Sequence, residues 1–444
     1  MYSAISFPLS SKGNKSPHGE IGKHKGLKIL AFNYVLSSSL SEGTNRWEVA
    51  VNKKQFVYDN VYDMTYCIRH EENKGSSSEI NSTNSRLKIR AFLECQFESG
   101  RGHHLMKKKI LITGSSGFLG QLAIDRYKED YDLVLLDLYS TNKNNFYQID
   151  VSEFDKLDQI ITKEKPNIIF HFASEIFDTH NKKKIYRTNV TGSHNVYKSA
   201  VKNNVDKLIF PSTFSLFEKD YDYLINETEP TSCKNFYGVT KSEIERFLLS
   251  SNSNLNISIF RCPVIVDKSR AHRLGVLFEF LKDNCTLWIL GNGSNKLQFV
   301  SASDLFDAID ISLNIKGKNV YNIGCEKVES MKETFEYLIE KTGSKSKIRY
   351  FNKSLGLYFL NILSFLRLIN FIDYHNKILV SNIVLDISHI KKDLNFLPKK
   401  NTAEPLLEAH NYYVDNFNDN QKKGQAIKPK MGFFKIIKLI SRII

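Results

Sequence analysis

Lys108-Lys-Ile-Leu-Ile-Thr-Gly-Ser-Ser-Gly-Phe-Leu-Gly120 is the stretch that decides how this chain folds. An apolar run, Ile110–Ile112, leads into glycines at positions 114, 117 and 120, and a helical pattern follows them. In such an arrangement the first glycine permits a tight turn and the second lets the backbone approach a pyrophosphate. The third lets the helix pack close to its strand. Because a helix N-terminus offers unpaired N–H groups to an anion, the stretch predicts a dinucleotide-binding loop.

A carboxylate ends the next apolar run, Asp132-Leu-Val-Leu-Leu-Asp137, and Asp137 lies 17 residues after Gly120. At this place a carboxylate accepts hydrogen bonds from the adenosine ribose hydroxyls and repels a 2′-phosphate. No basic residue follows directly, since Leu138-Tyr-Ser140 comes next. The pattern therefore favours NAD over NADP as the cofactor. The alternative is a solvated acid at a strand end.

Short apolar runs alternate with longer helical segments after Lys108, which is typical of a parallel, doubly wound sheet. The predicted strands are Ile110–Thr113, Leu133–Asp137, Ile168–Phe172, Lys207–Pro211 and Ile257–Arg261, and the clearest helices are Lys184–Asn203 and Phe236–Ser250. These strands are apolar throughout, as expected when helices cover both faces of a sheet. We therefore predict an α/β fold with a Rossmann-type NAD-binding domain over residues 106–265.

A smaller, mixed α/β lobe that binds the substrate is predicted over residues 266–415. Its expected strands are Thr286–Leu290, Leu297–Val300, Val320–Ile323 and Lys347–Phe351, and its expected helices are Ser303–Leu313 and Met331–Thr342. The apolar segment Leu355–Ile372 resembles a membrane span in length. Its polar residues recur at every third position and include Arg367, so we interpret it as an amphipathic helix.

Composition limits the class of protein. The 444 residues are 41% hydrophobic, which suits a soluble globular protein of two or three lobes. The formal charge of +14 suggests nucleic acid, but seven basic residues and no acid follow Asp419, so half of the excess lies in a short tail. We expect no nucleic-acid partner. The six cysteines contain no Cys-x-x-Cys pair, which indicates reduced thiols of a cytoplasmic protein, without a disulfide framework or a metal site.

Both ends of the chain differ from the centre. Residues 1–105 show no sustained hydrophobic period and no signal peptide, whereas Met106-Lys-Lys-Lys looks like a natural start. We hypothesise that residues 1–105 are disordered, or an upstream extension that the cell does not make. At the other end, a polar linker over 416–431 leads to a basic amphipathic tail, Gly432–Ile444, which is too short to span a bilayer.

The tail has two interpretations. A helix there would place Lys435, Lys438 and Arg442 on one face, which suits peripheral contact with an anionic membrane. The alternative is a helix that packs on the core or on a partner subunit. The localisation that we predict is cytoplasmic, with the first interpretation placing the protein at the inner face of the membrane.

The stretch Tyr237-Gly-Val-Thr-Lys241 carries the first candidate catalytic pair. On a helix, residues four apart share a face, so the Tyr237 hydroxyl and the Lys241 ammonium point into one cleft. A nearby cation lowers the pKa of a phenol and favours its use as a general base. Lys241 can also donate a hydrogen bond to the nicotinamide ribose. The alternative is an ordinary helix surface.

A hydroxyl group at the end of a predicted strand is the third catalytic candidate. In Phe210-Pro-Ser-Thr213-Phe-Ser, Thr213 lies 24 residues before Tyr237 and can share a hydrogen bond with the substrate oxygen that changes protonation. Ser212 is the competing candidate, and we prefer Thr213. The stretch also reads as an ordinary strand-to-loop turn, because Ser, Thr and Pro favour loops.

Together these motifs resemble the extended short-chain dehydrogenase/reductase family, in particular its NAD-dependent epimerase/dehydratase branch, over about Met106–Asn416. The matching pieces are Thr113–Gly120, Asp137, Asp150-Val151, His171-Phe-Ala-Ser174, Asn189, Thr213, Tyr237, Lys241 and Arg261-x-Pro263. The resemblance implies that the cofactor contacts Gly114, Ser116, Gly117, Phe118, Leu119, Gly120, Asp137, Asp150, Val151, Phe172, Ala173, Ser174, Asn189, Lys241, Pro263 and Val264. It implies that the substrate contacts Ser212, Thr213 and Lys296, and that the protein is a homodimer.

Three departures from the family pattern leave the sugar unassigned. Lys296 stands where the family often carries an arginine, and lysine lacks the bidentate fork of a guanidinium. The segment Arg261–Asp267 lacks the usual Asn-Val-Tyr-Gly-Pro ending, and Phe217-Glu218 replaces a common Tyr-Gly. These departures do not touch the predicted cofactor site.

The resemblance implies an enzyme that epimerises a nucleotide-sugar through transient hydride transfer to NAD, with Tyr237, Lys241 and Thr213 in acid–base roles. A 4,6-dehydratase should carry an Asp-Glu pair directly after Thr213, where Phe214-Ser215 stands, so we rank it lower. A dehydrogenase or reductase of a keto-sugar or a hydrophobic alcohol stays open, because the half-reaction uses the same groups. A non-catalytic NAD-binding protein is the remaining alternative.

Overall fold

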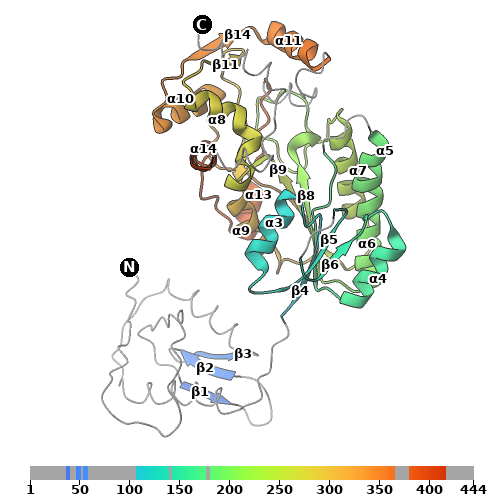
Figure 1. Cartoon of the computed structure of the whole chain (residues 1–444). Coiled ribbons are helices and arrows are strands. Elements are labelled where there is room, and N and C mark those ends of the chain that lie inside the picture. Colours follow the sequence, from blue (N-terminus) through green and yellow to red (C-terminus); the bar gives the residue numbers. More distant parts are fainter. Residues whose placement is uncertain are drawn as a thin grey trace. The chain divides into compact units, whose positions relative to one another are not determined.

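A computed structural model describes residues 107–139, 143–176, 181–365 and 380–416, together with three strands near the N-terminus (Figure 1). The chain divides into two compact units, Met1–Leu105 and Met106–Ile444. In the first unit, β1 (Ser37–Leu40), β2 (Trp47–Val51) and β3 (Lys54–Tyr58) form an antiparallel sheet. The sequence pattern did not predict these strands. That residues 1–105 are disordered or not made in the cell stays a hypothesis.

The second unit is built on a seven-stranded sheet in which all neighbouring strands are parallel. In chain order the strands are β4 (Lys109–Thr113), β5 (Asp132–Asp137), β6 (Phe146–Gln148), β7 (Ile168–His171), β8 (Lys207–Thr213), β9 (Asn256–Cys262) and β13 (Lys318–Asn322). Their order across the sheet is β13-β9-β8-β7-β4-β5-β6, so the winding direction reverses between β4 and β7. This is the doubly wound Rossmann topology, and the predicted fold class is confirmed.

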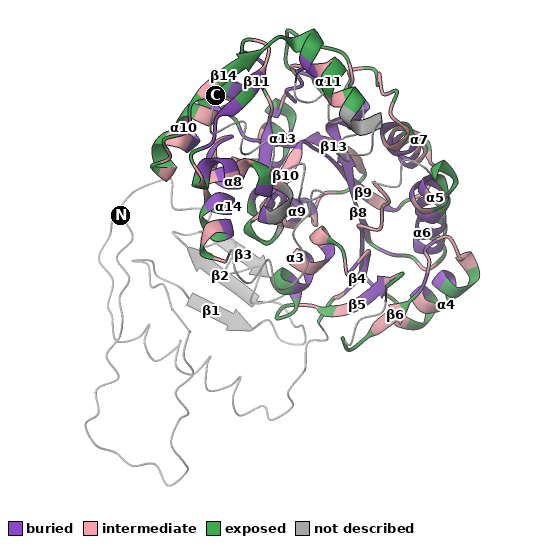
Figure 2. Ribbon diagram, turned by 45° about the horizontal axis from the view of Figure 1, so that its top comes forward, coloured by how far each residue is buried: buried purple, intermediate pink, exposed green. Residues whose placement is uncertain are grey.

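Helices cover both faces of this sheet because the side chains of each strand alternate between two apolar clusters. Ile110 and Ile112 pack with α3 (Phe118–Tyr127), α9 (Ala302–Ser312) and α13 (Ser388–Leu394). Leu111, between them, packs on the opposite face with α4 (Phe154–Glu164), α6 (Gly192–Lys202) and α7 (Phe236–Ser250). The sheet is the most buried part of the second unit (Figure 2).

Two predictions for this sheet need correction. The strand expected at Val320–Ile323 was assigned to the smaller lobe, but it is β13, which pairs with β9 at the edge of the main sheet. A local apolar pattern does not reveal which sheet a strand will join, so sequence order alone misplaced it. The helix predicted over Lys184–Asn203 is α5 (Lys182–Tyr186) and α6 joined by a π-helical turn, Arg187–Thr191. The short edge strand β6 was not predicted.

The smaller lobe contains two pairs of parallel strands. β10 (Val264–Val266) pairs with β12 (Phe299–Ser301), and β11 (Leu287–Leu290) pairs with β14 (Ile348–Phe351). The lobe's helices are α8 (Gly275–Lys282), α10 (Met331–Thr342), α11 (Lys353–Phe365) and α14 (Glu404–Asp415). Leu287, Phe278 and Leu338 lie in its main apolar cluster. The predicted lobe boundaries themselves stay predictions.

The structure describes only part of the two amphipathic segments predicted from the sequence. Within the described residues, no helix is both long and apolar enough to cross a membrane. α11 covers the first part of the predicted segment Leu355–Ile372, and residues 366–379 lie outside the description. The linker after residue 416 and the tail Gly432–Ile444 also lie outside it.

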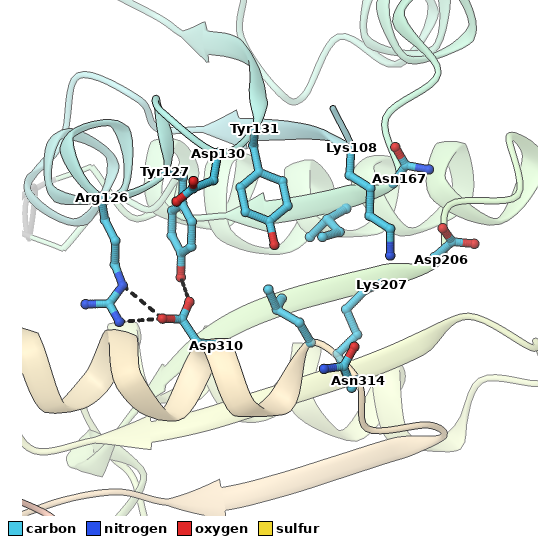
Figure 3. Close-up of a pocket in the computed structure, with 12 residues that line it drawn as sticks. Lys108, Arg126, Tyr127, Asp130, Tyr131, Asn167, Asp206, Lys207, Asp310 and Asn314 are labelled. Carbon is cyan, nitrogen blue, oxygen red and sulfur yellow. Dashed lines mark hydrogen bonds and ion pairs between the residues drawn. The ribbon is translucent and has the colours of Figure 1, made fainter. Parts of the chain in front are cut away.

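A polar cluster joins α3 to α9 at the amino ends of the strands, beside a hollow of about 550 Å³ (Figure 3). The buried Tyr127 donates a hydrogen bond from its hydroxyl to Asp310 at 2.5 Å. Arg126 forms ion pairs with Asp310 and with Asp307, the latter at 2.7 Å. Burial, together with the neighbouring Asp310, raises the pKa of Tyr127. The cluster therefore anchors α3, whose other end carries the predicted dinucleotide loop.

Tyr127→Phe is expected to lower the free energy of unfolding by about 1–2 kcal/mol, because it keeps the buried ring and removes the hydrogen bond to a carboxylate. Tyr131→Phe is the matched control, since the described residues supply no hydrogen bond to the Tyr131 hydroxyl, which faces the hollow in Figure 3. Urea denaturation measures both variants. An equal loss in both would show that the Tyr127–Asp310 bond does not anchor α3.

Candidate active site

Three glycines shape the loop between β4 and α3, and each meets a different constraint. Gly114 has φ +68°, and a Cβ there would lie 2.6 Å from the backbone nitrogen of Ala173. A Cβ on Gly120 would lie 2.3 Å from the carbonyl oxygen of Gly114. At Gly117, the N-cap of α3, the nearest atom would be 3.1 Å away, and no side chain caps the helix. The turn therefore needs glycine at position 114 and the close packing needs it at position 120, whereas Gly117 leaves the helix N-terminus open to an anion.

Asp137, at the end of β5, is bonded to the glycine loop. Its carboxylate accepts the backbone N–H of Ser116 at 2.8 Å and that of Tyr139 at 3.0 Å. The carboxylate thus lies beside the loop where the adenosine ribose is expected. Its role as the ribose acceptor stays a prediction.

A buried histidine connects the dinucleotide loop to the strand beside it. Ser193 Oγ donates to the carbonyl of Asn189 at 2.6 Å, so His171 Nε2–H donates to Ser193 Oγ at 2.8 Å. His171 Nδ1 then accepts from Thr113 Oγ1 at 2.7 Å, and Thr113 Oγ1 accepts the N–H of Ala173 at 3.2 Å. Each hydroxyl both donates and accepts, which fixes one neutral tautomer. Burial, with a contribution from Lys241, lowers the pKa of His171 to about 3.

Asn189 lies in the π-helical turn and links two segments of the site. Its amide group donates to the carbonyl of Glu175 at 3.0 Å and to the hydroxyl of Thr240 at 3.1 Å. Its side-chain oxygen accepts from Glu175 N–H at 2.8 Å and from Ser174 Oγ at 3.1 Å. The loop after β7 is therefore tied to α7, one residue before Lys241. π-helical turns often occur at functional sites. This one places Asn189, a predicted cofactor residue, between the loop after β7 and helix α7.

The start of α7 is docked against the end of β8. Asn235 caps the helix by accepting Gly238 N–H at 2.6 Å, and its own amide group donates to the carbonyl of Ser215 at 3.1 Å. Glu218 in turn accepts the backbone N–H of Asn235 at 2.6 Å. A Cβ on Gly238 would lie 2.4 Å from that Ser215 carbonyl oxygen. The glycine that follows Tyr237 therefore allows the helix turn carrying Tyr237 to press against the segment after Thr213.

Lys241 is almost fully buried, with 4% of its surface exposed. Its Nζ donates to the carbonyl of Pro211 at 3.0 Å and lies 4.3 Å from the ring centre of Phe210 and 5.9 Å from that of Tyr237. Burial lowers the pKa of Lys241 to about 8, so the ammonium still prevails at neutral pH. Burial raises the pKa of the neighbouring Cys262 to about 12, which keeps that thiol protonated.

The hydroxyl groups at the end of β8 are arranged differently from one another. Thr213 Oγ1 donates to Ser215 Oγ at 2.8 Å and accepts Ser215 N–H at 3.0 Å. Ser212 Oγ is buried and has no hydrogen-bond partner within the described residues. Sequence reasoning missed Ser215, although the Phe-Ser that follows Thr213 already carried the signal. The choice between Thr213 and Ser212 as the substrate contact stays a prediction.

Three further residues that were predicted to contact the cofactor are held by contacts with other parts of the fold. Asp150 forms an ion pair with Arg187 at 3.2 Å, and the carbonyl of Val151 accepts from Asn195 at 3.1 Å. Phe172 stacks on Phe170 with ring centres 5.5 Å apart, so its side chain packs into the core and only its backbone borders the loop.

Pro263 and Val264 follow directly after β9, at the same edge of the sheet as the loop and α7. Lys296 is exposed on the smaller lobe, where its backbone N–H donates to Asn382 at 2.8 Å. The described side-chain contacts do not join Lys296 to the loop or to α7, and its contact with the substrate stays a prediction.

The fold and the site define a dinucleotide-binding α/β protein with a Tyr–Lys pair beside the cofactor loop. A family model described as NAD dependent epimerase/dehydratase family matches residues 110–324. That range begins in β4 and ends after β13, so it includes the whole central sheet. The match covers just under half of the chain, and it confirms the predicted resemblance to this family of NAD-dependent enzymes, with NAD as the cofactor.

Individual relatives include both epimerases and dehydratases. A putative UDP-glucose 4-epimerase of Methanocaldococcus jannaschii is 27% identical over 260 residues, 54% of this chain and 85% of the relative. The human dTDP-D-glucose 4,6-dehydratase is 24% identical over 360 residues, 72% of this chain and 94% of the relative. The crystal structure of UDP-glucose 4-epimerase from Thermotoga maritima has the same fold, with a TM-score of 0.57 at 22% identity, covering 70% of this chain and 99% of that one.

Two glycine variants separate the packing role from the binding role. Gly120→Ala is expected to lower the free energy of unfolding by about 2–3 kcal/mol, because its Cβ would overlap the backbone of the loop. Gly117→Ala is expected to lower it by less, about 1 kcal/mol, because alanine is a poorer N-cap than glycine and its Cβ would lie 3.1 Å from the carbonyl oxygen of Gly114. It is expected to weaken NAD binding by about tenfold or more, since its methyl group covers the open helix N-terminus. Thermal unfolding and NAD titration calorimetry measure the two effects. Equal loss of stability in both variants would contradict this division of roles.

His171 is expected to make the protein sensitive to acid. An unfolded histidine binds a proton below about pH 6.5, whereas the folded His171 resists protonation until about pH 3. Stability is therefore present above pH 6.5 and falls as the pH drops below it, by about 2 kcal/mol at pH 5 from this group alone. His171→Leu loses stability at all pH values but lacks this contribution. Urea denaturation at pH 7 and pH 5 should show a smaller pH dependence in the variant, and an unchanged dependence would contradict the assignment.

Proposed function

We propose that the protein is an NAD-dependent epimerase of a nucleotide-sugar. The observation that carries this proposal is the docking of α7 on the end of β8, which gathers Tyr237, Lys241 and Thr213 at the same sheet edge as the dinucleotide loop. The UDP-glucose 4-epimerases among the relatives support the substrate class.

The chain's own residues have defined roles in this reaction. NAD, held by the glycine loop between β4 and α3, would supply the hydride acceptor and, once reduced, the hydride donor. Tyr237 removes the proton from the sugar hydroxyl as the adjoining carbon loses its hydride, and it gives the proton back when the keto-sugar is reduced on its other face. Lys241, charged at neutral pH, favours the deprotonated phenol and orients the nicotinamide ribose. Thr213 shares a hydrogen bond with the reacting oxygen.

Dehydration is the less favoured outcome, despite the dehydratases among the relatives. Eliminating a hydroxyl from the sugar needs a group that protonates it as it leaves. Of the two residues after Thr213, Phe214 is 3% exposed and packs with Phe217 in an apolar cluster, and Ser215 is bonded to Thr213. Neither position offers a carboxylate.

The remaining parts of the proposal concern partners. We infer a homodimer from the family resemblance and a peripheral membrane contact from the basic tail Gly432–Ile444. A dehydrogenase or reductase of a keto-sugar or a hydrophobic alcohol is the alternative reaction, because it needs the same proton transfer without the return of the hydride. A non-catalytic NAD-binding protein is disfavoured, because Tyr237, Lys241 and Thr213 are all present.

Tyr237→Phe is expected to lower turnover by about 100- to 10,000-fold while NAD binding is retained, because it removes only the proton-transfer group. Tyr186→Phe is the matched control, since the Tyr186 hydroxyl lies on α5 and donates to Glu243 at 2.9 Å. Proton NMR of the full chain with catalytic NAD and a panel of UDP-, GDP- and dTDP-hexoses measures conversion. A new anomeric signal that only Tyr237→Phe fails to produce would establish epimerisation.

Two other results would change the assignment. Stoichiometric NADH from excess NAD, without an epimer, would make the protein a dehydrogenase. Equal conversion by Tyr237→Phe and by the unaltered chain would exclude Tyr237 as the catalytic acid–base group.

A further inference from the structure

The outer face of the smaller lobe exposes an unusual amount of apolar surface. Six large residues, which we call the lobe patch, are at least 37% exposed: Trp288, Phe351, Leu355, Tyr358, Phe359 and Ile362. Tyr358 and Leu355 are the most open, at 67% and 61%. Figure 2 shows β14 and α11 as mainly exposed at this edge of the lobe. Soluble monomers seldom leave a contiguous apolar surface of this kind without a function for it.

The patch is continuous because α11 lies against the strand pair β11–β14. A Cβ on Gly356 would lie 2.3 Å from Leu290 and 3.2 Å from Phe351, so the helix contacts the strands through this glycine. Trp288 lies two residues before Leu290, on the same face of the pair, and its ring meets that of Phe351 edge-on at 6.4 Å. The two strands and the helix therefore share one outer surface.

The spacing of residues on α11 points its apolar stripe away from the lobe. Leu355, Tyr358, Phe359 and Ile362 follow the i, i+3, i+4, i+7 pattern of one helix face, and all four are exposed. Such a stripe normally faces a protein core. Here the face that contacts the lobe contains Gly356, and the stripe is left for another partner.

Positive charge lies beside the patch, along β14 and at the start of α11. From Lys345 to Ile372 the sequence contains five basic residues and no acidic one. Lys345, Lys347 and Arg349 are exposed and form no ion pair within the described residues. Lys353 lies 3.9 Å from Asp220, and both side chains are about half exposed. The acidic residues of α10 lie on a helix whose Leu338 packs with Leu287, on the face of β11 opposite Trp288.

We propose that the lobe patch binds the surface of an anionic lipid membrane. Apolar side chains at helical spacing, bordered by lysine and arginine, suit a helix that lies in the interface between head groups and acyl chains. Tyrosine and tryptophan are favoured at that depth, because each has an apolar ring and a polar atom. The surrounding basic side chains attract anionic head groups.

The positive charge also favours an anionic membrane over two other possible partners of the patch, a second copy of the chain and the chain's own tail. A second copy of the chain, related by a two-fold axis, would bring two sets of Lys345, Lys347 and Arg349 together and incur repulsion. The chain's own tail is basic as well, with Lys435, Lys438 and Arg442. An anionic surface neutralises the patch, whereas these two add to its charge. The inference does not depend on the reaction proposed above, since it uses no residue of the active site.

The test uses the full chain with Trp47→Phe, which leaves Trp288 as the single tryptophan because the sequence contains two. Vesicles of phosphatidylcholine, with or without roughly one third phosphatidylglycerol, are the probe. We expect sedimentation only with the anionic vesicles, and quenching of Trp288 fluorescence by lipids brominated near the head of the acyl chain. Added salt should weaken the binding.

Three double variants test whether the lobe patch is the surface that binds the vesicles. Leu355→Glu/Phe359→Glu is expected to weaken vesicle binding by about tenfold or more, because it replaces apolar anchors with charges that anionic lipid repels. Val201→Glu/Leu249→Glu is the matched control, as these residues are 37% and 39% exposed on α6 and α7. Lys345→Gln/Lys347→Gln leaves the apolar residues intact and should weaken binding by roughly fivefold per charge. Circular dichroism and NAD titration check that each variant is folded.

Several outcomes would overturn the proposal. Equal binding to neutral and anionic vesicles would remove the charge argument, and unquenched Trp288 would place the patch away from the lipid. Binding that Lys435→Glu/Lys438→Glu abolishes, and that the patch variants leave unchanged, would assign it to the tail instead. A dimer that dissociates in Leu355→Glu/Phe359→Glu, without any vesicle binding, would make the patch an interface between copies of the chain.

Discussion

The close approach of backbone to backbone at the glycine loop is the constraint on which the rest of the structure depends. A Cβ on Gly120 would overlap the carbonyl oxygen of Gly114, and a Cβ on Gly114 would overlap the backbone of Ala173, just after β7. Because both side chains are absent, α3 starts directly at the end of β4, and the loop lies against the segment after β7. The helix N-terminus, Asp137 and the end of β7 then border one site. The other side chains of the site are placed relative to this contact.

A chain of hydrogen bonds extends across the sheet from the strand before the glycine loop to α7. Thr113, His171 and Ser193 form a chain of hydrogen bonds whose direction is set by the carbonyl of Asn189. The Asn189 side chain then joins the loop after β7 to Thr240 on α7. A buried polar group that loses its partner costs free energy, so each member holds the next in position. The network thus ties the cofactor loop to the helix that carries Tyr237 and Lys241, although it includes neither of those two residues.

The reaction and the membrane contact that we propose use opposite properties of the same chain. At the active site, Lys241 and Phe214 are buried away from water, and neither of the two positions after Thr213 carries a carboxylate. On the smaller lobe, apolar side chains remain exposed beside unpaired basic ones. An enzyme whose catalytic site lies in the sheet, and whose smaller lobe rests on lipid, would act on soluble nucleotide-sugars close to the membrane surface.

Local patterns in the sequence were enough to predict the central fold and NAD as the cofactor, whereas the residues assigned to the cofactor site stay predictions. The strand, the glycine spacing and Asp137 are neighbours in the chain, and their geometry follows from backbone sterics and helical periodicity, which act over a few residues. The same holds for Tyr237 and Lys241, one helical turn apart. Only the tertiary structure decided which sheet β13 joins, how His171 and Asn189 connect separate segments, and that the stripe on α11 faces outward. These features depend on contacts between residues far apart in the chain, and a local pattern shows that a residue is apolar or polar without showing what it meets.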